Sequence, residues 1–213
     1  MNQTTSAPAR WPLIAAALIA IAVGFLIGRM FLDQPTPFDA NAPTQWPEPK
    51  PLAPFELVSD SGKSFTNSAL ADRWSLVFFG YTHCPDVCPT TLSYLNNVAG
   101  KLAKDHTLER PLQVLFVSVD PQRDTPAQLG EYVRYFNPSF TGLTGSDSQL
   151  EAFARQLGSI YMRIAGSSET DYLMDHSSHI LLVDPKGRLS TLFRTNHSVE
   201  TITAAIAHLD KEF

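Results

Sequence analysis

The sequence predicts an α/β domain that follows an apolar N-terminal helix. Two short apolar runs, residues 76–79 and 112–119, have the length and the composition of buried strands. Helical patterns lie between and after these runs, so strands alternate with helices, as in α/β proteins. Ahead of them, residues 11–28 carry no charged side chain. The elements are taken below in chain order.

The first elements of the domain are predicted to be a hairpin, a buried strand and a helix. Residues 55–58 and 63–66 are joined by a turn over residues 60–62, which favours a hairpin. The buried strand over residues 76–79 follows, and a helix is expected over residues 89–102.

The second half repeats this alternation. After the strand over residues 112–119, Thr125 as cap and Pro126 in the first turn predict a helix over residues 126–136. Further elements are expected as a helix over 148–157, a hairpin of 180–183 with 188–193, and a final helix over 199–209. An α/β domain that ends in a hairpin and a helix is of the thioredoxin type.

The N-terminal segment is predicted to be a transmembrane anchor over residues 11–32. Its apolar run continues past Arg29 and approaches the roughly 20 residues that cross a bilayer. A cleaved signal peptide is the alternative, with residues 20–22 (AIA) as its cleavage site. The apolar run extends well beyond Ala22, which favours an anchor that is retained. Residues 33–54 are rich in proline and are expected to be an extended linker to the domain at 55–213.

Charge restricts the location and the partners. Arg10 lies before the span, so residues 1–10 are expected in the cytoplasm and the domain outside. There the two cysteines would meet an oxidising compartment. The net charge of −5 offers no overall basic balance, so nucleic acid is not expected as a partner.

Cys84 and Cys88 are the only cysteines and lie in residues 80–91 (GYTHCPDVCPTT), directly after the first buried strand. Pro85 and Pro89 disfavour helical conformation at the cysteines that precede them, so the helix is expected to begin at Pro89. Cys88 would then lie at the helix N-terminus, where the helix dipole favours a thiolate. The two sulfurs could bind Cu(I), zinc or an iron–sulfur cluster. They could instead form a redox disulfide.

His176 is the candidate for a third ligand, because it stands just before the strand at residues 180–183. Two sulfurs and one nitrogen suit copper in either oxidation state. His83 and His179 are auxiliary candidates, although strand alternation would place His179 on the face opposite to His176. Met162 and Met174 are soft donors whose usual role is packing.

The remaining polar candidates have structural alternatives. Asp120 and Asp124 could tune the site, and Asp124 could instead help Thr125 to cap the next helix. Asp175 could orient an imidazole or simply face water. Surface positions are expected for the other histidines, His106, His197 and His208.

Three separate motifs resemble the Sco/SenC family of copper chaperones: residues 78–89 (FFGYTHCPDVCP), 117–126 (VSVDPQRDTP) and 175–177 (DHS). The resemblance spans about residues 52–213. It implies a thioredoxin-like domain in which Cys84, Cys88 and His176 bind copper.

The same resemblance implies a role in assembling the copper A centre of cytochrome c oxidase. The expected partners are the oxidase subunit that carries copper A and a second periplasmic copper chaperone. The expected location is the bacterial inner membrane with the domain in the periplasm. The alternative is the mitochondrial inner membrane, facing the intermembrane space.

Two other functions use the same cysteines. A membrane-anchored thiol–disulfide reductase would act on the oxidase cysteines or in redox signalling. The spacing is C-x-x-x-C rather than the C-x-x-C of thioredoxins, and residues 170–183 lack the proline that thioredoxins place opposite their cysteines. A thiol peroxidase would need an activating arginine and threonine, and only Thr82 is close in sequence. The sequence therefore favours a metallochaperone over an enzyme.

Overall fold

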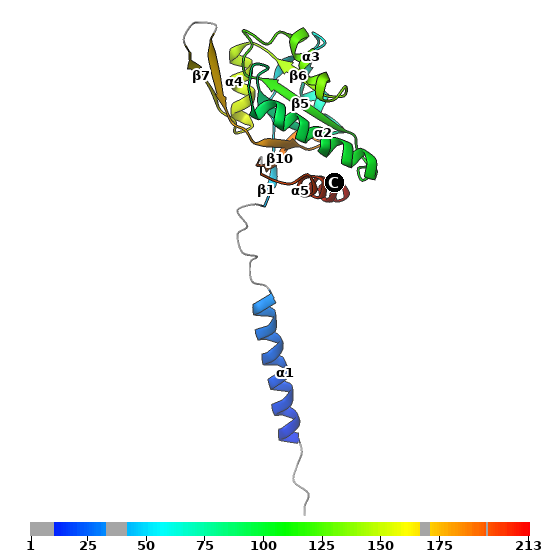
Figure 1. The fold of residues 1–213 in the computed structure, drawn as a ribbon. Helices are drawn as coiled ribbons and strands as arrows, with labels where there is room; N and C mark the ends of the chain where they lie inside the picture. Colours follow the sequence, from blue (N-terminus) through cyan, green and yellow to red (C-terminus); the bar gives the residue numbers. More distant parts are fainter. Residues whose placement is uncertain (1–10, 33–41, 167–170, 195) are drawn as a thin grey trace, which may run out of the picture. The chain divides into compact units, whose positions relative to one another are not determined.

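The computed structural model describes residues 11–32, 42–166, 171–194 and 196–213 (Figure 1). The chain forms two compact units, Met1–Ala40 and Asn41–Phe213. The described part of the first unit is helix α1 (Trp11–Leu32), 22 residues long. Within the described residues, none of the helices has the length and hydropathy needed to cross a membrane. The N-terminal segment 1–10 and residues 33–41 of the predicted linker lie outside the described residues.

An eight-stranded mixed sheet forms the centre of the second unit, in the order β1-β10-β9-β4-β5-β6-β2-β3. Its strands are β1 (Thr44–Pro51), β2 (Glu56–Ser59), β3 (Ser64–Thr66), β4 (Trp74–Gly80), β5 (Leu112–Ser118), β6 (Thr141–Thr144), β9 (Ile180–Val183) and β10 (Arg188–Phe193). Strands β4, β5 and β6 are parallel, and the other pairs are antiparallel. A separate two-stranded antiparallel sheet contains β7 (Tyr161–Ala165) and β8 (Tyr172–His176).

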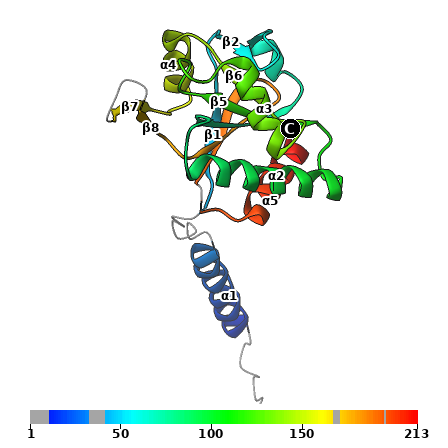
Figure 2. The same ribbon diagram turned by 45° about the horizontal axis from the view of Figure 1, so that its top comes forward.

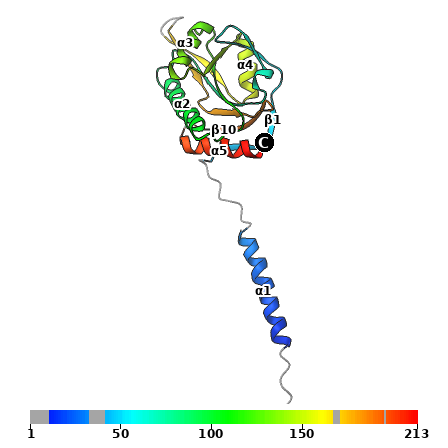
Figure 3. The same ribbon diagram turned by 90° about the vertical axis from the view of Figure 1, so that its right-hand side faces the viewer.

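Helices cover both faces of the central sheet. They are α2 (Val87–Asp105), α3 (Pro126–Phe136), α4 (Asp147–Gln156) and α5 (Val199–Glu212), with a short 3-10 helix, η1 (Asn67–Leu70). Phe116 on β5 contacts Tyr132 of α3, whereas Phe79 on β4 contacts Phe153 of α4 from the opposite face. Figure 3 shows α2 and α4 on opposite sides of the sheet, and Figure 2 shows α5 beside α2.

Coverage of both faces explains the apolar sequences of the central strands. Every residue of β4 and of β9 is buried, so neither strand shows the alternation of apolar and polar residues that a half-exposed strand would need. Because these strands are buried, polar side chains gather at their carboxyl ends and in the loops that follow them.

The α/β prediction is confirmed. The first hairpin, the strands β4 and β5, and the final hairpin lie within two residues of their predicted bounds. Helix α3 begins and ends as predicted. Thr125 caps it in a reciprocal pair of hydrogen bonds with Gln128.

The structure adds four strands that the sequence did not predict, namely β1, β6, β7 and β8. Strand β1 lies within the predicted linker over residues 33–54, so the folded unit begins well before residue 55. An edge strand tolerates the missing N–H groups of Pro47, Pro49 and Pro51, which is why a segment rich in proline can join the sheet there.

Helix α2 begins at Val87 rather than at Pro89 and ends at Asp105 rather than at residue 102. Pro89 therefore lies in the first turn, where its missing N–H group has no intrahelical partner to lose. Cys88 belongs to the same turn.

A buried carboxylate joins the C-terminal helix to the start of β4. Asp210 on α5 accepts hydrogen bonds from Trp74 Nε1 (2.8 Å), Arg110 Nη1 (3.1 Å) and the backbone N–H of Glu109. Burial raises the pKa of Asp210, but these donors outweigh burial and hold the pKa below its usual range.

We predict that Asp210→Ala lowers the free energy of unfolding by on the order of 3 kcal/mol, because it leaves Arg110 and Trp74 without their buried acceptor. Urea denaturation at pH 7 measures this loss. A carboxylate with a lowered folded-state pKa stabilises the fold above the unfolded-state pKa of about 4 and loses that effect as the pH falls through the folded-state value. The gap between wild type and variant should therefore narrow in acid.

The control is Glu109→Gln, whose side chain is 78% exposed. We expect it to change the free energy of unfolding by less than about 0.5 kcal/mol. An Asp210→Ala protein as stable as this control would contradict the role assigned to the buried carboxylate.

Candidate metal centre

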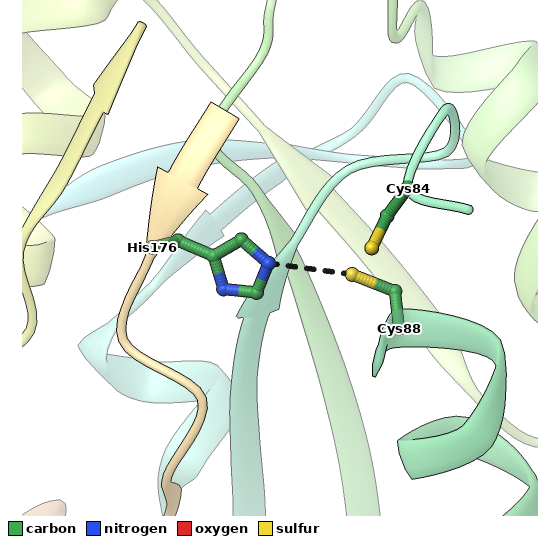
Figure 4. A group of neighbouring side chains, drawn as sticks. All are labelled: Cys84, Cys88 and His176. Carbon is green, nitrogen blue, oxygen red and sulfur yellow. Dashed lines mark hydrogen bonds between the residues drawn. The ribbon is translucent and has the colours of Figure 1, made fainter. Parts of the chain in front are cut away.

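Cys84, Cys88 and His176 converge at the carboxyl end of β4 (Figure 4). The two sulfurs and one imidazole nitrogen all lie within 4.8 Å of one another. Cys88 Sγ is 3.5 Å from His176 Nε2. Within the described part of the chain, no other group of three or more histidine, cysteine or acidic side chains is gathered in this way.

The cysteine loop leaves the sheet at Gly80, where a glycine is required by packing. A Cβ atom at this position would lie 2.7 Å from Cys88 Sγ and 2.6 Å from the ring of Phe116. The missing side chain therefore makes room for the sulfur against the sheet. Cys88 is fully buried, whereas Cys84 is half-buried and its backbone N–H donates to the carbonyl of Tyr81 (3.2 Å).

Asp124 fixes the loop from the neighbouring strand connection. Its fully buried carboxylate accepts hydrogen bonds from the backbone N–H of Thr82 (3.0 Å), from Thr82 Oγ1 (2.6 Å) and from Ser118 Oγ (2.6 Å). The proposed capping role is filled instead by Thr125 with Gln128. Asp124 thus ties the residues before Cys84 to the end of β5.

His176 is the last residue of β8, which brings it to the cysteine loop from a distant part of the chain. Its Nδ1 lies 3.1 Å from the carbonyl oxygen of Ser177. A proton on Nδ1 would be donated to that carbonyl and leave the Nε2 lone pair facing Cys88. The rings of Phe78 and Tyr81 meet the imidazole edge-on, each at 6.0 Å between ring centres.

Burial acts on the protonation of His176 and of Cys88. It lowers the pKa of His176, which keeps the imidazole neutral and able to bind a metal at neutral pH. Burial also raises the pKa of the Cys88 thiol strongly. Loss of solvation therefore opposes the thiolate that the sequence predicts at Cys88 in the metal-free protein.

The two auxiliary histidines lie outside this cluster. His83 is half exposed, with Nδ1 3.1 Å from Thr82 Oγ1 and 3.8 Å from Asp124. His179 Nε2 pairs with Ser159 Oγ at 2.9 Å.

The other donor atoms have structural surroundings. Met162 is exposed, Met174 packs against the core, and Asp175 faces solvent. Asp120 is buried and binds Arg123 and the hydroxyl of Tyr172 (2.7 Å), an assembly that the sequence did not indicate.

The surface prediction fails for one of the three remaining histidines. His106 and His208 are exposed, as expected. His197 is buried, and its Nδ1 accepts a hydrogen bond from the backbone N–H of Arg194 (3.2 Å). Its ring packs edge-on against Phe193, the last residue of β10, which is why it lies inside.

The donor set restricts the chemistry. Two sulfurs and one imidazole suit soft and borderline metal ions, above all copper, and no carboxylate belongs to the cluster to favour magnesium or calcium. Structural zinc sites use four protein ligands, and three are present. Both cysteines are free thiols, and their proximity also permits a disulfide.

Comparisons with known proteins agree with this geometry. A sequence model described as SCO1/SenC matches residues 45–211. The mitochondrial SCO1 homolog 1 of Arabidopsis thaliana is 37% identical over 153 residues, which are 72% of this chain and 45% of that protein. A putative copper-binding protein of Stutzerimonas stutzeri is 35% identical over 81% of this chain and 83% of its own length. The chain thus spans less than half of the plant relative.

Solved structures match over the same region. The crystal structure of Arabidopsis thaliana ScoI with copper bound has a TM-score of 0.70 and 35% identity, covering 76% of this chain and 98% of that one. Yeast Sco1 with copper bound also has a TM-score of 0.70, at 32% identity, with coverage of 78% and 91%. Because the family match covers most of the chain and the folds agree, the chain belongs to the SCO1/SenC family.

Proposed function

We propose that this protein binds copper through Cys84, Cys88 and His176 and delivers it to the copper A centre of cytochrome c oxidase during assembly. The observation that carries the proposal is the convergence of two sulfurs and one imidazole nitrogen within 4.8 Å. Relatives solved with copper bound support the choice of metal. The role in oxidase assembly rests on membership in the family.

Copper is the cargo, and the burial of the ligands suits its transfer. Cys88 is buried, whereas Cys84 and His176 are half-buried. His176 also lines a surface cavity of ≈ 220 Å³ with Tyr161 and Met162. Ligands of an acceptor can therefore approach the metal from the side of His176 while the buried Cys88 still holds it. Binding Cu(I) would also supply the positive charge that a thiolate at Cys88 needs.

The second candidate function is a thiol–disulfide reductase that acts on the oxidase cysteines or in redox signalling. The proximity of the two free thiols supports it. In this function the half-buried Cys84 would be the attacking sulfur, because burial raises the pKa of Cys88 and suppresses its thiolate. Simple dithiol exchange does not require the contact of Cys88 with His176, whereas a copper carrier needs the third ligand, which is why copper delivery is preferred.

We propose membrane attachment through residues 11–32, with residues 1–10 in the cytoplasm and the domain outside. Support comes from the sequence of this segment, whose single charged residue is Arg29. Helix α1 also exposes apolar side chains such as Leu18, Ile21 and Phe25, which a bilayer would cover. The location is the inner membrane with the domain in the periplasm, or in the intermembrane space if the protein is mitochondrial.

Replacing the proposed ligands tests copper binding. Wild type should bind one copper ion, and its Cu(II) form should show a thiolate-to-copper charge-transfer band. Cys84→Ala and Cys88→Ala should each lower the Cu(I) affinity by more than about a hundredfold. This is a larger loss than the roughly 10- to 100-fold that follows when a residue hydrogen-bonded to a ligand is removed. His176→Ala should weaken Cu(II) more than Cu(I), because two thiolates still hold Cu(I). Competition titration with a chromophoric chelator measures each affinity.

The matched control is His179→Ala, which removes a half-buried histidine from the same segment. It should retain the affinity and the absorption spectrum of the wild type. Loss of the band in this variant, with a normal band in His176→Ala, would refute the assigned ligand set.

His176→Ala also separates delivery from reduction. The variant should keep a reducible Cys84–Cys88 pair but fail to support an active copper A centre in cells grown with scarce copper. Oxidase activity and the redox state of the thiols are the measurements, and circular dichroism confirms that the variant is folded. Normal oxidase assembly in the folded variant would favour the thiol reductase.

A reporter fused after Phe213 tests the topology. Alkaline phosphatase, which needs an oxidising compartment, should be active in this position, whereas a β-galactosidase fusion at the same site should be inactive. The reverse pattern would place the domain in the cytoplasm and contradict both the topology and the proposed delivery.

A further inference from the structure

The strand that carries His176 has little support from its own sheet. Strand β8 pairs with β7 alone, and β7 is almost wholly exposed. An isolated two-stranded hairpin is marginally stable in water. A contact outside the ladder must therefore hold β8 if His176 is to keep its place opposite the cysteines.

Met174 packs against the core, and the most extensive set of polar contacts lies at the start of β8, at Tyr172. Its hydroxyl donates to the buried Asp120 (2.7 Å), and its backbone carbonyl accepts from Arg123 Nη1 (3.1 Å). Its ring lies between two guanidinium groups, with Arg123 at 3.6 Å and Arg163 at 3.8 Å from the ring centre. Arg123 is itself fixed by an ion pair with Asp120.

The same guanidinium group also contacts the cysteine side of the site. Arg123 lies 5.7 Å from the ring centre of Tyr81, which meets the imidazole of His176 edge-on. The carbonyl of Tyr81 in turn accepts the N–H of Cys84. Arg123 is therefore a single group that lies against both the start of the cysteine loop, at Tyr81, and the strand that brings the histidine.

We propose that Arg123 is a positioning residue, which braces β8 through Tyr172 and so sets the distance between His176 and the cysteine pair. This inference rests on the proposed copper site. Lysine in its place would keep the positive charge but lose the flat stacking surface and the fork that reaches Tyr172 and Asp120 together. The charge alone does not hold the hairpin.

Arg123→Lys in the full chain is the test. In the metal-free protein, the amides of β7 and β8 should exchange their hydrogens at least about tenfold faster, while those of β4 and β5 remain unchanged. The nuclear Overhauser effect between the rings of His176 and Tyr81 should weaken. The Cu(II) affinity should fall about tenfold, and the Cu(I) affinity should change by less than about threefold, because the two sulfurs keep their places.

Arg155→Lys is the matched control, since Arg155 is an exposed arginine paired with Glu151 on α4. It should leave every measurement at the wild-type value. Two results would overturn the proposal. One is an Arg123→Lys protein whose β7 and β8 amides exchange their hydrogens at the wild-type rate. The other is faster exchange with an unchanged contact between the rings of His176 and Tyr81 and an unchanged Cu(II) affinity. If Arg123→Lys does not fold, Tyr172→Leu decides by the same criteria, because it removes the braced ring and leaves the Asp120–Arg123 pair.

Failure of the copper site would look different. If the wild-type protein binds no copper, the proposed function fails, while hydrogen exchange and the contact between the rings of His176 and Tyr81 still report on the brace. If Arg123→Lys changes both measurements in a protein that binds no copper, the positioning role of Arg123 is confirmed. If the wild type binds copper and Arg123→Lys changes neither measurement, the positioning role is refuted.

Discussion

A buried carboxylate on one strand connection fixes the geometry of this domain's cysteine loop. Asp124 has no exposure to solvent, and it accepts hydrogen bonds from Thr82 and Ser118. A buried carboxylate is costly unless its oxygens are satisfied by donors, so these bonds constrain the residues that supply them. The parallel pairing of β4 with β5 brings the two connections side by side, and Asp124 then fixes one to the other. Cys84 lies only two residues after Thr82, so the hydrogen bonds between Thr82 and Asp124 also restrict the position of Cys84.

The two sides of the site are held by different physical means. Hydrogen bonds to a buried carboxylate hold the cysteine loop, whereas aromatic and guanidinium stacking at Tyr172 supports the histidine strand. The metal-free protein keeps a protonated Cys88 because burial opposes its charge. Introducing a cation reverses that balance, since the thiolate and the metal neutralise each other. A site of this kind favours release of a proton when metal binds.

Much of the fold was predictable because its central strands and helices have strong local signals. Continuous apolar runs marked β4 and β5, and the cap at Thr125 marked α3. Strand β1 was missed because its prolines are also typical of an extended linker. The β7–β8 hairpin was missed because Met162 and Ile164 are apolar yet exposed, which obscures the alternation. The cysteine pair and His176 were found from local motifs and from the family resemblance. Asp124, Arg123 and Tyr172 owe their roles to contacts between distant segments, which residue spacing alone does not disclose.

Strand β1 has a consequence for the behaviour of the protein at high local density. An exposed sheet edge offers unpaired N–H and carbonyl groups to a strand of another molecule, and so invites aggregation. At one edge of this sheet, Pro47, Pro49 and Pro51 have no N–H to offer. At the other edge, β3 has only 3 residues, too few for an extended ladder. Copies of this domain crowded together on a surface would therefore find few donors for joining sheet to sheet, and the sheet resists growing into a fibre.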